Sequence, residues 1–224
     1  GAFAEYVTVA SHETVRLPDG VDSTLGALVE PLAVGLHAVN VGRIRRGETC
    51  LVIGAGPVGL STALWARHFG AGRVIVSEIA PARRALAEQM GATTVLDPRA
   101  DGLDSSLAEL APEGPDVVFE TVGAPGVIQE AIGQVRFRGR VVVAGLCFSA
   151  DTIQPLPATF NEVNVRFVLA YEKDDFQYTV DMMEQERIDP RPVVTDRIGL
   201  DEVPEAFETL AKPDSQCKVM VYPG

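Results

Sequence analysis

The residues most able to do chemistry in this sequence belong to the glycine-rich segment 54–59, Gly-Ala-Gly-Pro-Val-Gly, which follows a short apolar run and precedes an apolar segment at 60–69. In that context, Gly54 permits a tight turn, Gly56 lets the backbone approach a pyrophosphate, and Gly59 lets a helix pack close to the strand. The free N–H groups and the positive end of the helix dipole would then face phosphates. The segment therefore predicts a dinucleotide site made by Gly54, Gly56, Pro57, Val58 and Gly59.

An acidic residue stands where the ribose of such a dinucleotide would lie. Glu78 comes 19 residues after Gly59 and ends the next apolar run. A carboxylate there can accept both ribose hydroxyls of NAD and would repel the 2′-phosphate of NADP. Arg83 could lie along the adenosine, and Arg83 with Arg84 keeps NADP open as an alternative. The alternative for Glu78 is a solvated charge at a strand end, and Arg83 could equally be a solvated charge at a helix start.

A parallel sheet is needed to position these groups. From about residue 48, short β-branched runs alternate with amphipathic segments, which is typical of βαβ units in an α/β fold. The runs contain few polar residues, as expected of strands buried on both faces. The predicted strands are Cys50–Ile53, Arg73–Glu78, Thr93–Leu96, Asp116–Glu120, Arg140–Gly145 and Asn164–Leu169. Helices are expected between them, including 60–69 and 81–90, and after them around Phe176 and Phe207, before a last strand at Lys218–Tyr222. Short strands are also expected within residues 1–17, before a turn at 18–20.

Composition excludes several classes of protein. The chain has 224 residues and a net charge of −12, so a basic nucleic-acid-binding surface is not expected. Its three cysteines are far apart, which argues against a local zinc knuckle and against a disulfide framework. No uninterrupted run of 18 apolar residues and no signal segment is present, so we expect a cytoplasmic protein without membrane partners.

The order of the motifs resembles the medium-chain, zinc-dependent alcohol and polyol dehydrogenase family, whose members include sorbitol, butanediol and threonine dehydrogenases. Residues 1–6 resemble its GGFAEY strand, residues 30–38 its EPLA…HA segment, and residues 54–59 its GAGPxG loop. Residues 116–123 resemble DVVxExxG, and residues 139–146 resemble GGRVVVxGL. The resemblance implies a Rossmann fold of six strands flanked by remnants of a GroES-like catalytic β domain.

Further site residues are implied by this resemblance. Thr121 and Val122 would flank the adenine side of the cofactor, whereas Ala144, Gly145 and Leu146 would flank the nicotinamide, with the backbone of 168–170 near its carboxamide. Glu30 matches a family glutamate beside the catalytic zinc, which it reaches directly or through water. The alternative for Glu30 is an acid at a helix start, stabilised by the dipole. We expect His37 to pack in the core, and His12 and His68 lack any metal-ligand spacing.

The sequence also departs from the family pattern. The GxCGSD segment, the His-Glu pair and the four-cysteine lobe that hold zinc are not found, so a missing N-terminal portion of the catalytic domain is expected. Ala170 stands where sorbitol-type members hold an arginine that contacts the polyol. The implied domains are 1–39 and 171–224, from the catalytic domain, around a cofactor domain at 40–170.

The predicted function is NAD(H)-dependent hydride transfer to or from a small secondary alcohol or polyol, with zinc in the intact enzyme. The chain alone would bind cofactor and turn over little. One alternative is a zinc-independent NADPH quinone or enoyl reductase, and another is a non-catalytic nucleotide-binding or assembly module. A homodimer or homotetramer is expected, paired through an edge at 164–169 or 146–153.

Overall fold

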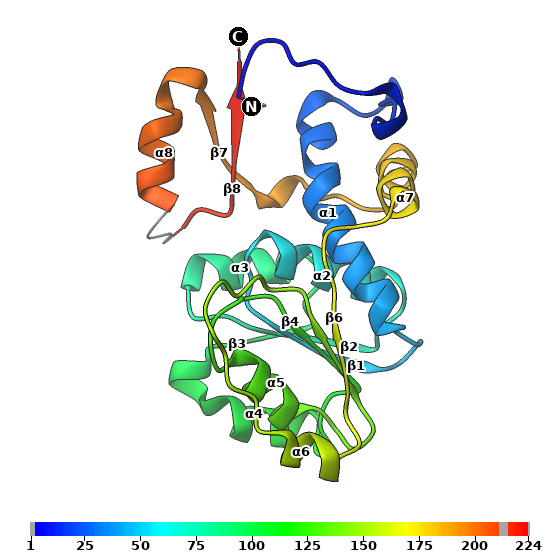
Figure 1. Ribbon diagram of the computed structural model, residues 1–224, viewed down its shortest axis with the longest axis vertical. Helices are drawn as coiled ribbons and strands as arrows, with labels where there is room; N and C mark the ends of the chain where they lie inside the picture. Colours follow the sequence, from blue (N-terminus) through cyan, green and yellow to red (C-terminus); the bar gives the residue numbers. More distant parts are fainter. Residues whose placement is uncertain (1–2, 211–214, 224) are drawn as a thin grey trace.

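The computed structural model describes residues 3–210 and 215–223, and a six-stranded parallel sheet forms its centre (Figure 1). The strand order is β3-β2-β1-β4-β5-β6, and each neighbouring pair is parallel. This is the doubly wound order of a Rossmann fold, so the predicted fold class is confirmed. The strands are β1 (Thr49–Ile53), β2 (Arg73–Ser77), β3 (Thr94–Leu96), β4 (Val117–Glu120), β5 (Arg140–Val143) and β6 (Asn164–Phe167).

Helices cover both faces of this sheet because successive strand residues point to opposite sides. Cys50 and Val52 of β1 face one core with Trp65, whereas Leu51 and Ile53 face the other core. One layer contains α1 (Ser23–Gly42), α2 (Pro57–His68) and α3 (Pro81–Gln89). The opposite layer contains α4 (Leu103–Leu110), α5 (Val127–Gln134) and α6 (Pro155–Phe160), seen below the sheet in Figure 1.

The long helix α1 joins the sheet to the rest of the molecule. The Asp22 side chain caps its start by accepting a hydrogen bond from the Leu25 N–H at 2.8 Å. Its length and hydropathy would suffice to cross a membrane, but the helix packs in the core against α2 and α7 (Lys173–Glu184). We therefore interpret α1 as a core helix. It runs through the division predicted at residue 39, and the three predicted domains stay a prediction.

Two further strands lie apart from the main sheet. β7 (Val194–Gly199) pairs in parallel with β8 (Lys218–Tyr222), at the top left of Figure 1. α8 (Val203–Leu210) lies between these two strands in the chain. The bounds of β8 match the prediction, whereas β7 was not predicted. A π-helical turn, η2 (Pro98–Gly102), and the 3-10 turns η3 (Arg191–Val193) and η4 (Leu200–Glu202) complete the connections.

The strands expected within residues 1–17 are a wrong prediction for the described part of that segment. Residues 3–17 contain a 3-10 turn, η1 (Ser11–Glu13), and no strand. A strand needs a hydrogen-bonded neighbour, and none of the described strands pairs with this segment. Its alternating side chains Phe3, Tyr6, Val7 and Val9 are therefore exposed. Gly1 and Ala2 of the motif lie outside the described residues.

Candidate functional site

The strand order reverses between β1 and β4, and a crevice opens beyond the carboxyl ends of these two strands. Gly54 follows β1 with a positive φ of 97°, and its N–H donates to the Ser77 carbonyl at 2.8 Å. Thr121 follows β4, and its hydroxyl donates to the Ile53 carbonyl at 2.8 Å. The two predicted segments are thus held together at the end of the sheet where doubly wound folds bind ligands.

Gly59 is required for a close approach rather than for contact with a ligand. A Cβ at this position would lie 2.1 Å from the Gly54 carbonyl oxygen and 2.7 Å from the Thr121 hydroxyl. Gly56 caps the N-terminus of α2, and a Cβ there would meet nothing within 4 Å. The loop therefore leaves open space at Gly56, in front of the N-terminus of α2, where a phosphate would be stabilised.

A cavity of about 420 Å³, here called the glycine-loop cavity, lies along this loop. Its wall contains Gly54, Gly56, Glu78, Arg83, Thr121 and Val122, all of them predicted cofactor residues. The Glu78 carboxylate accepts the Ala55 N–H on Oε2 and the Ala80 N–H on Oε1, both at 2.8 Å. A carboxylate oxygen has two lone pairs, so each oxygen keeps one for a ribose hydroxyl.

The two neighbouring arginines differ in their roles. Arg84 donates to the Glu78 and Ile79 carbonyls at 2.9 and 2.8 Å and pairs with Asp97 at 2.9 Å, which fixes the turn after β2. Arg83 lines the cavity, and its guanidinium donates to the Gln216 carbonyl at 3.2 and 3.3 Å. Arg83 therefore ties the segment before β8 to the cofactor domain, and its predicted contact with adenosine stays a prediction.

A second cavity of about 410 Å³, here called the Glu30 cavity, shares Thr121 with the first. It is lined by the remaining predicted residues Glu30, Pro57, Val58, Ala144, Gly145, Leu146 and the 168–170 backbone. Thirteen site residues were predicted, and only Gly59 lies outside both cavities, beneath the loop. Two adjacent cavities at the carboxyl ends of the strands suit an elongated ligand with two halves.

Glu30 lies in the interior of α1, next to Pro31, and not in its first turn. The interpretation of Glu30 as a helix-start acid is therefore wrong, because α1 begins seven residues earlier at Ser23. Glu30 lines the Glu30 cavity instead. Burial, and then the nearby charge of Glu30, raise the pKa of Tyr171 above its usual value. Lys218 of β8 brings a positive charge to the same cavity wall.

A buried glutamate, Glu120, binds the two turns that line these cavities, one through its carboxylate and one through its main-chain carbonyl. Glu120 is 1% exposed, and its Oε1 accepts the N–H groups of Val122 and Gly123 at 2.7 and 2.8 Å. Its main-chain carbonyl accepts the N–H groups of Ala144 and Gly145 at 2.8 and 3.0 Å. Glu120 thus connects the adenine-side turn to the nicotinamide-side turn.

Comparison with known proteins agrees with this geometry. The sequence profile of a family described as zinc-binding dehydrogenase matches residues 57–185. This match begins at the helix that follows the glycine loop and covers more than half of the chain. The chain belongs to the zinc-binding dehydrogenase family.

Relatives of this zinc-binding dehydrogenase chain have both similar sequences and similar folds. Sorbitol dehydrogenase of Bacillus subtilis is 32% identical over all of the chain, which covers 64% of that protein. The structure of 2R,3R-butanediol dehydrogenase from Bacillus subtilis is 32% identical, with a TM-score of 0.86 over 94% of this chain and 60% of that one. An NADP-bound structure from Sinorhizobium meliloti 1021, described as a zinc-binding dehydrogenase, is 32% identical with a TM-score of 0.91, over 100% of this chain and 66% of that one. The chain thus spans a little under two thirds of these relatives.

The residues described for this zinc-binding dehydrogenase chain do not by themselves fit a zinc ion. Within residues 3–210 and 215–223, no group of three His, Cys, Asp or Glu side chains could hold a metal. His37 is instead bound to Asp175 of α7, with 2.9 Å between Nδ1 and Oδ2, as expected for a core histidine. Glu30 is one carboxylate without histidine or cysteine partners, and no chemistry through zinc follows from these side chains.

Sequence reasoning missed the roles of Glu120 and Lys218 in the site. The link made by Glu120 could have been suspected from an acid that ends a fully apolar strand, since a buried carboxylate needs partners. Lys218 gave no comparable signal, because only the tertiary fold brings β8 to the cavity 188 residues away from Glu30.

Proposed function

We propose that this chain is the cofactor-binding part of a nicotinamide-dependent dehydrogenase that acts on a small alcohol or polyol. The observation that carries the proposal is the pair of adjacent cavities at the reversal of strand order, with an open glycine loop and a Glu78 carboxylate that keeps free lone pairs. The names of the relatives, sorbitol dehydrogenase and butanediol dehydrogenase, support the class of substrate.

The residues of the chain would bind and orient the cofactor. The N–H groups at the start of α2 would take the pyrophosphate, with Lys218 supplying positive charge on the facing wall. Glu78 would accept the adenosine ribose hydroxyls, and Val122 would lie against the adenine side. Ala144, Gly145 and Leu146 would support the nicotinamide, which supplies the hydride acceptor when bound.

We propose NAD rather than NADP as the preferred cofactor because Glu78 would repel a 2′-phosphate. Arg83 on the same cavity wall, together with the NADP bound in the Sinorhizobium meliloti structure, supports NADP as the second candidate. Zinc in the intact enzyme, beside Glu30, is proposed on the family description and not on a ligand set in this chain.

The proposal is tested by titrating the chain with NADH and with NADPH, followed by the fluorescence of the reduced nicotinamide. We expect saturable binding of NADH, weaker binding of NADPH, and little alcohol oxidation by the chain alone. Tighter binding of NADPH, with quinone reduction that a chelator does not inhibit, would favour the zinc-independent reductase. An intact protein that binds NADH but oxidises no alcohol would favour the non-catalytic module.

We also propose that the intact protein is a soluble, cytoplasmic homodimer or homotetramer. β6 is an edge strand, and a groove beside it of about 440 Å³ is lined by Leu146, Phe148, Phe167 and Leu169. These four side chains are between 57% and 96% exposed. Apolar side chains gathered along an unpaired strand edge suit pairing with a second copy.

A further inference from the structure

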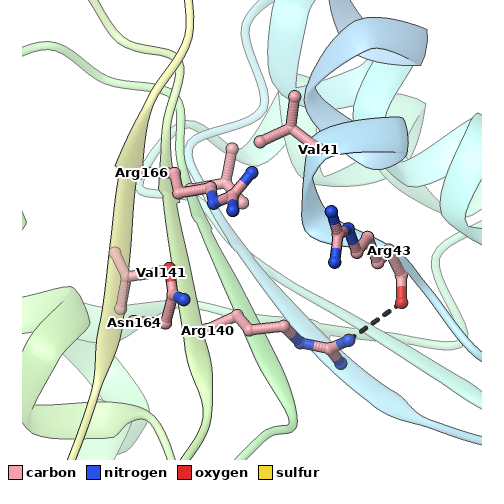
Figure 2. Close-up of a pocket in the computed structure, with 7 residues that line it drawn as sticks. Val41, Arg43, Arg140, Val141, Asn164 and Arg166 are labelled. Carbon is pink, nitrogen blue, oxygen red and sulfur yellow. Dashed lines mark hydrogen bonds between the residues drawn. The ribbon is translucent and has the colours of Figure 1, made fainter.

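Three arginines converge at the end of the sheet opposite to the cofactor cavities. Arg140 and Asn164 are the first residues of β5 and β6, Arg166 lies further along β6, and Arg43 follows the last residue of α1. Together with Val41, Val141 and Val142 they line a pocket of about 70 Å³. Figure 2 shows the side chains of Arg166 and Arg43 extending toward one another, with Arg140 beneath them.

One of these arginines already has its partners. The Arg140 guanidinium donates to the Arg43 carbonyl at 2.8 Å, which caps the C-terminus of α1 (Figure 2). It also donates to Glu48 Oε2 at 2.6 Å. Glu48 is itself engaged, since the same oxygen accepts the Arg45 N–H at 2.8 Å. The partners of Arg140 therefore give it a structural role, and its side chain also lines the pocket.

Arg43 and Arg166 differ from Arg140 in their guanidinium contacts. Within the described part of the chain, neither guanidinium has an ion pair or a hydrogen-bond acceptor. Among residues 3–210 and 215–223, Glu48 is the one carboxylate bound to this cluster, so the three guanidinium groups have an excess of two positive charges. This excess stands out in a chain with a net charge of −12. Arg43 and Arg166 are exposed, and an anion between like charges relieves the repulsion that water leaves unscreened.

We propose that this pocket, here called the arginine pocket, binds a small oxyanion of the phosphate or sulfate class. The guanidinium fork matches the geometry of such an anion, and the Asn164 side chain adds a donor from the strand edge. The volume supports a small ligand, because about 70 Å³ is well below the roughly 300 Å³ at which pockets for larger organic ligands begin. The site is separate from the cofactor cavities and does not depend on the proposed function.

The test is a titration of the full chain with sodium phosphate at constant ionic strength, followed by NMR of the arginine Nε–H groups. We expect saturable shifts at Arg43, Arg140 and Arg166. Arg43→Gln or Arg166→Gln should weaken the binding about tenfold or more, the loss expected for one charge-assisted hydrogen bond. Arg138→Gln is the matched control, because Arg138 is exposed and already paired with Glu162. Phosphate bound at the glycine loop would be seen separately, at the amide of Gly56.

Two results would overturn the proposal. One is a set of shifts at Arg43 and Arg166 no larger than those at Arg138 over the same titration. The other is a set of shifts that follows the protein concentration in the absence of phosphate, since this would place a carboxylate of a second copy in the arginine pocket.

Discussion

Replacement of Glu78 by glutamine tests how the chain distinguishes two nicotinamide cofactors. Both carboxylate oxygens accept a backbone N–H, from Ala55 and Ala80, and both keep a lone pair toward the glycine-loop cavity. In Glu78→Gln one acceptor becomes an NH₂ donor and the negative charge is lost. A hydrogen bond to a charged group contributes about 1.5–3 kcal/mol, so the Kd for NADH should rise about 10- to 150-fold.

NADPH should respond in the opposite direction. Two unit charges 4 Å apart near a protein surface repel by about 4 kcal/mol, so loss of the Glu78 charge should improve NADPH binding. The ratio of the Kd for NADPH to that for NADH should then fall by about 100-fold or more, measured by nucleotide fluorescence titration. Glu88→Gln is the matched control, because Glu88 is an exposed acid on α3, the helix that follows Glu78. A ratio that stays within about twofold of the original in a folded Glu78→Gln protein, as judged by its circular dichroism, would refute the assignment.

Three other predictions follow from the same structure. Gly59→Ala should lower the free energy of unfolding in urea by about 1–3 kcal/mol, because its Cβ would meet the Gly54 carbonyl. Gly56→Ala should preserve stability and weaken the binding of NADH. Equal losses of stability in the two variants would contradict this prediction. Burial raises the pKa of Cys50 to about 12 and that of Cys217 to about 11, so both thiols stay protonated at pH 8. Of the three cysteines, only Cys147 should therefore react rapidly with a thiol reagent. Rapid reaction of all three thiols would contradict the burial of Cys50 and Cys217. Phe167→Asp in the intact protein should shift the sedimentation coefficient toward that of a monomer. Phe207→Asp should leave it unchanged, because Phe207 is similarly exposed but lies on α8, away from the edge strand. An unchanged sedimentation coefficient for Phe167→Asp would exclude the edge-strand interface.

The centre of the fold could be predicted from sequence because its strands are short, apolar and buried on both faces. Each of the six runs became a strand, although three of them, β2, β5 and β6, ended one or two residues earlier than expected, where the chain turns into the crevice. Glu78, for example, follows β2 and does not end it, and this leaves its carboxylate free to bind the glycine loop.

The outlying elements could not be predicted in the same way. Val194–Gly199 contains Thr, Asp and Arg, and its burial is intermediate, so no apolar run marks β7. Its identity as a strand comes from the pairing with β8, more than 20 residues later. The reverse error occurred in residues 3–17, where an alternating pattern has no pairing strand among the described residues.

Contacts between distant segments could not be predicted from the sequence either. The bond from Arg83 to the Gln216 carbonyl joins residues 133 positions apart, and it occupies a side chain expected along the adenosine. The arginine pocket draws on the end of α1 and on two strands about 100 residues later. Such groupings depend on the tertiary fold, which no local spacing encodes.

The most direct test of the account is a crystal structure of the chain with NADH. We predict the adenosine ribose within hydrogen-bond distance of the Glu78 carboxylate, the pyrophosphate at the start of α2 beside Gly56, and the nicotinamide against residues 144–146. A nucleotide bound elsewhere, or one whose ribose does not contact Glu78, would contradict the proposal that these adjacent cavities are the cofactor site.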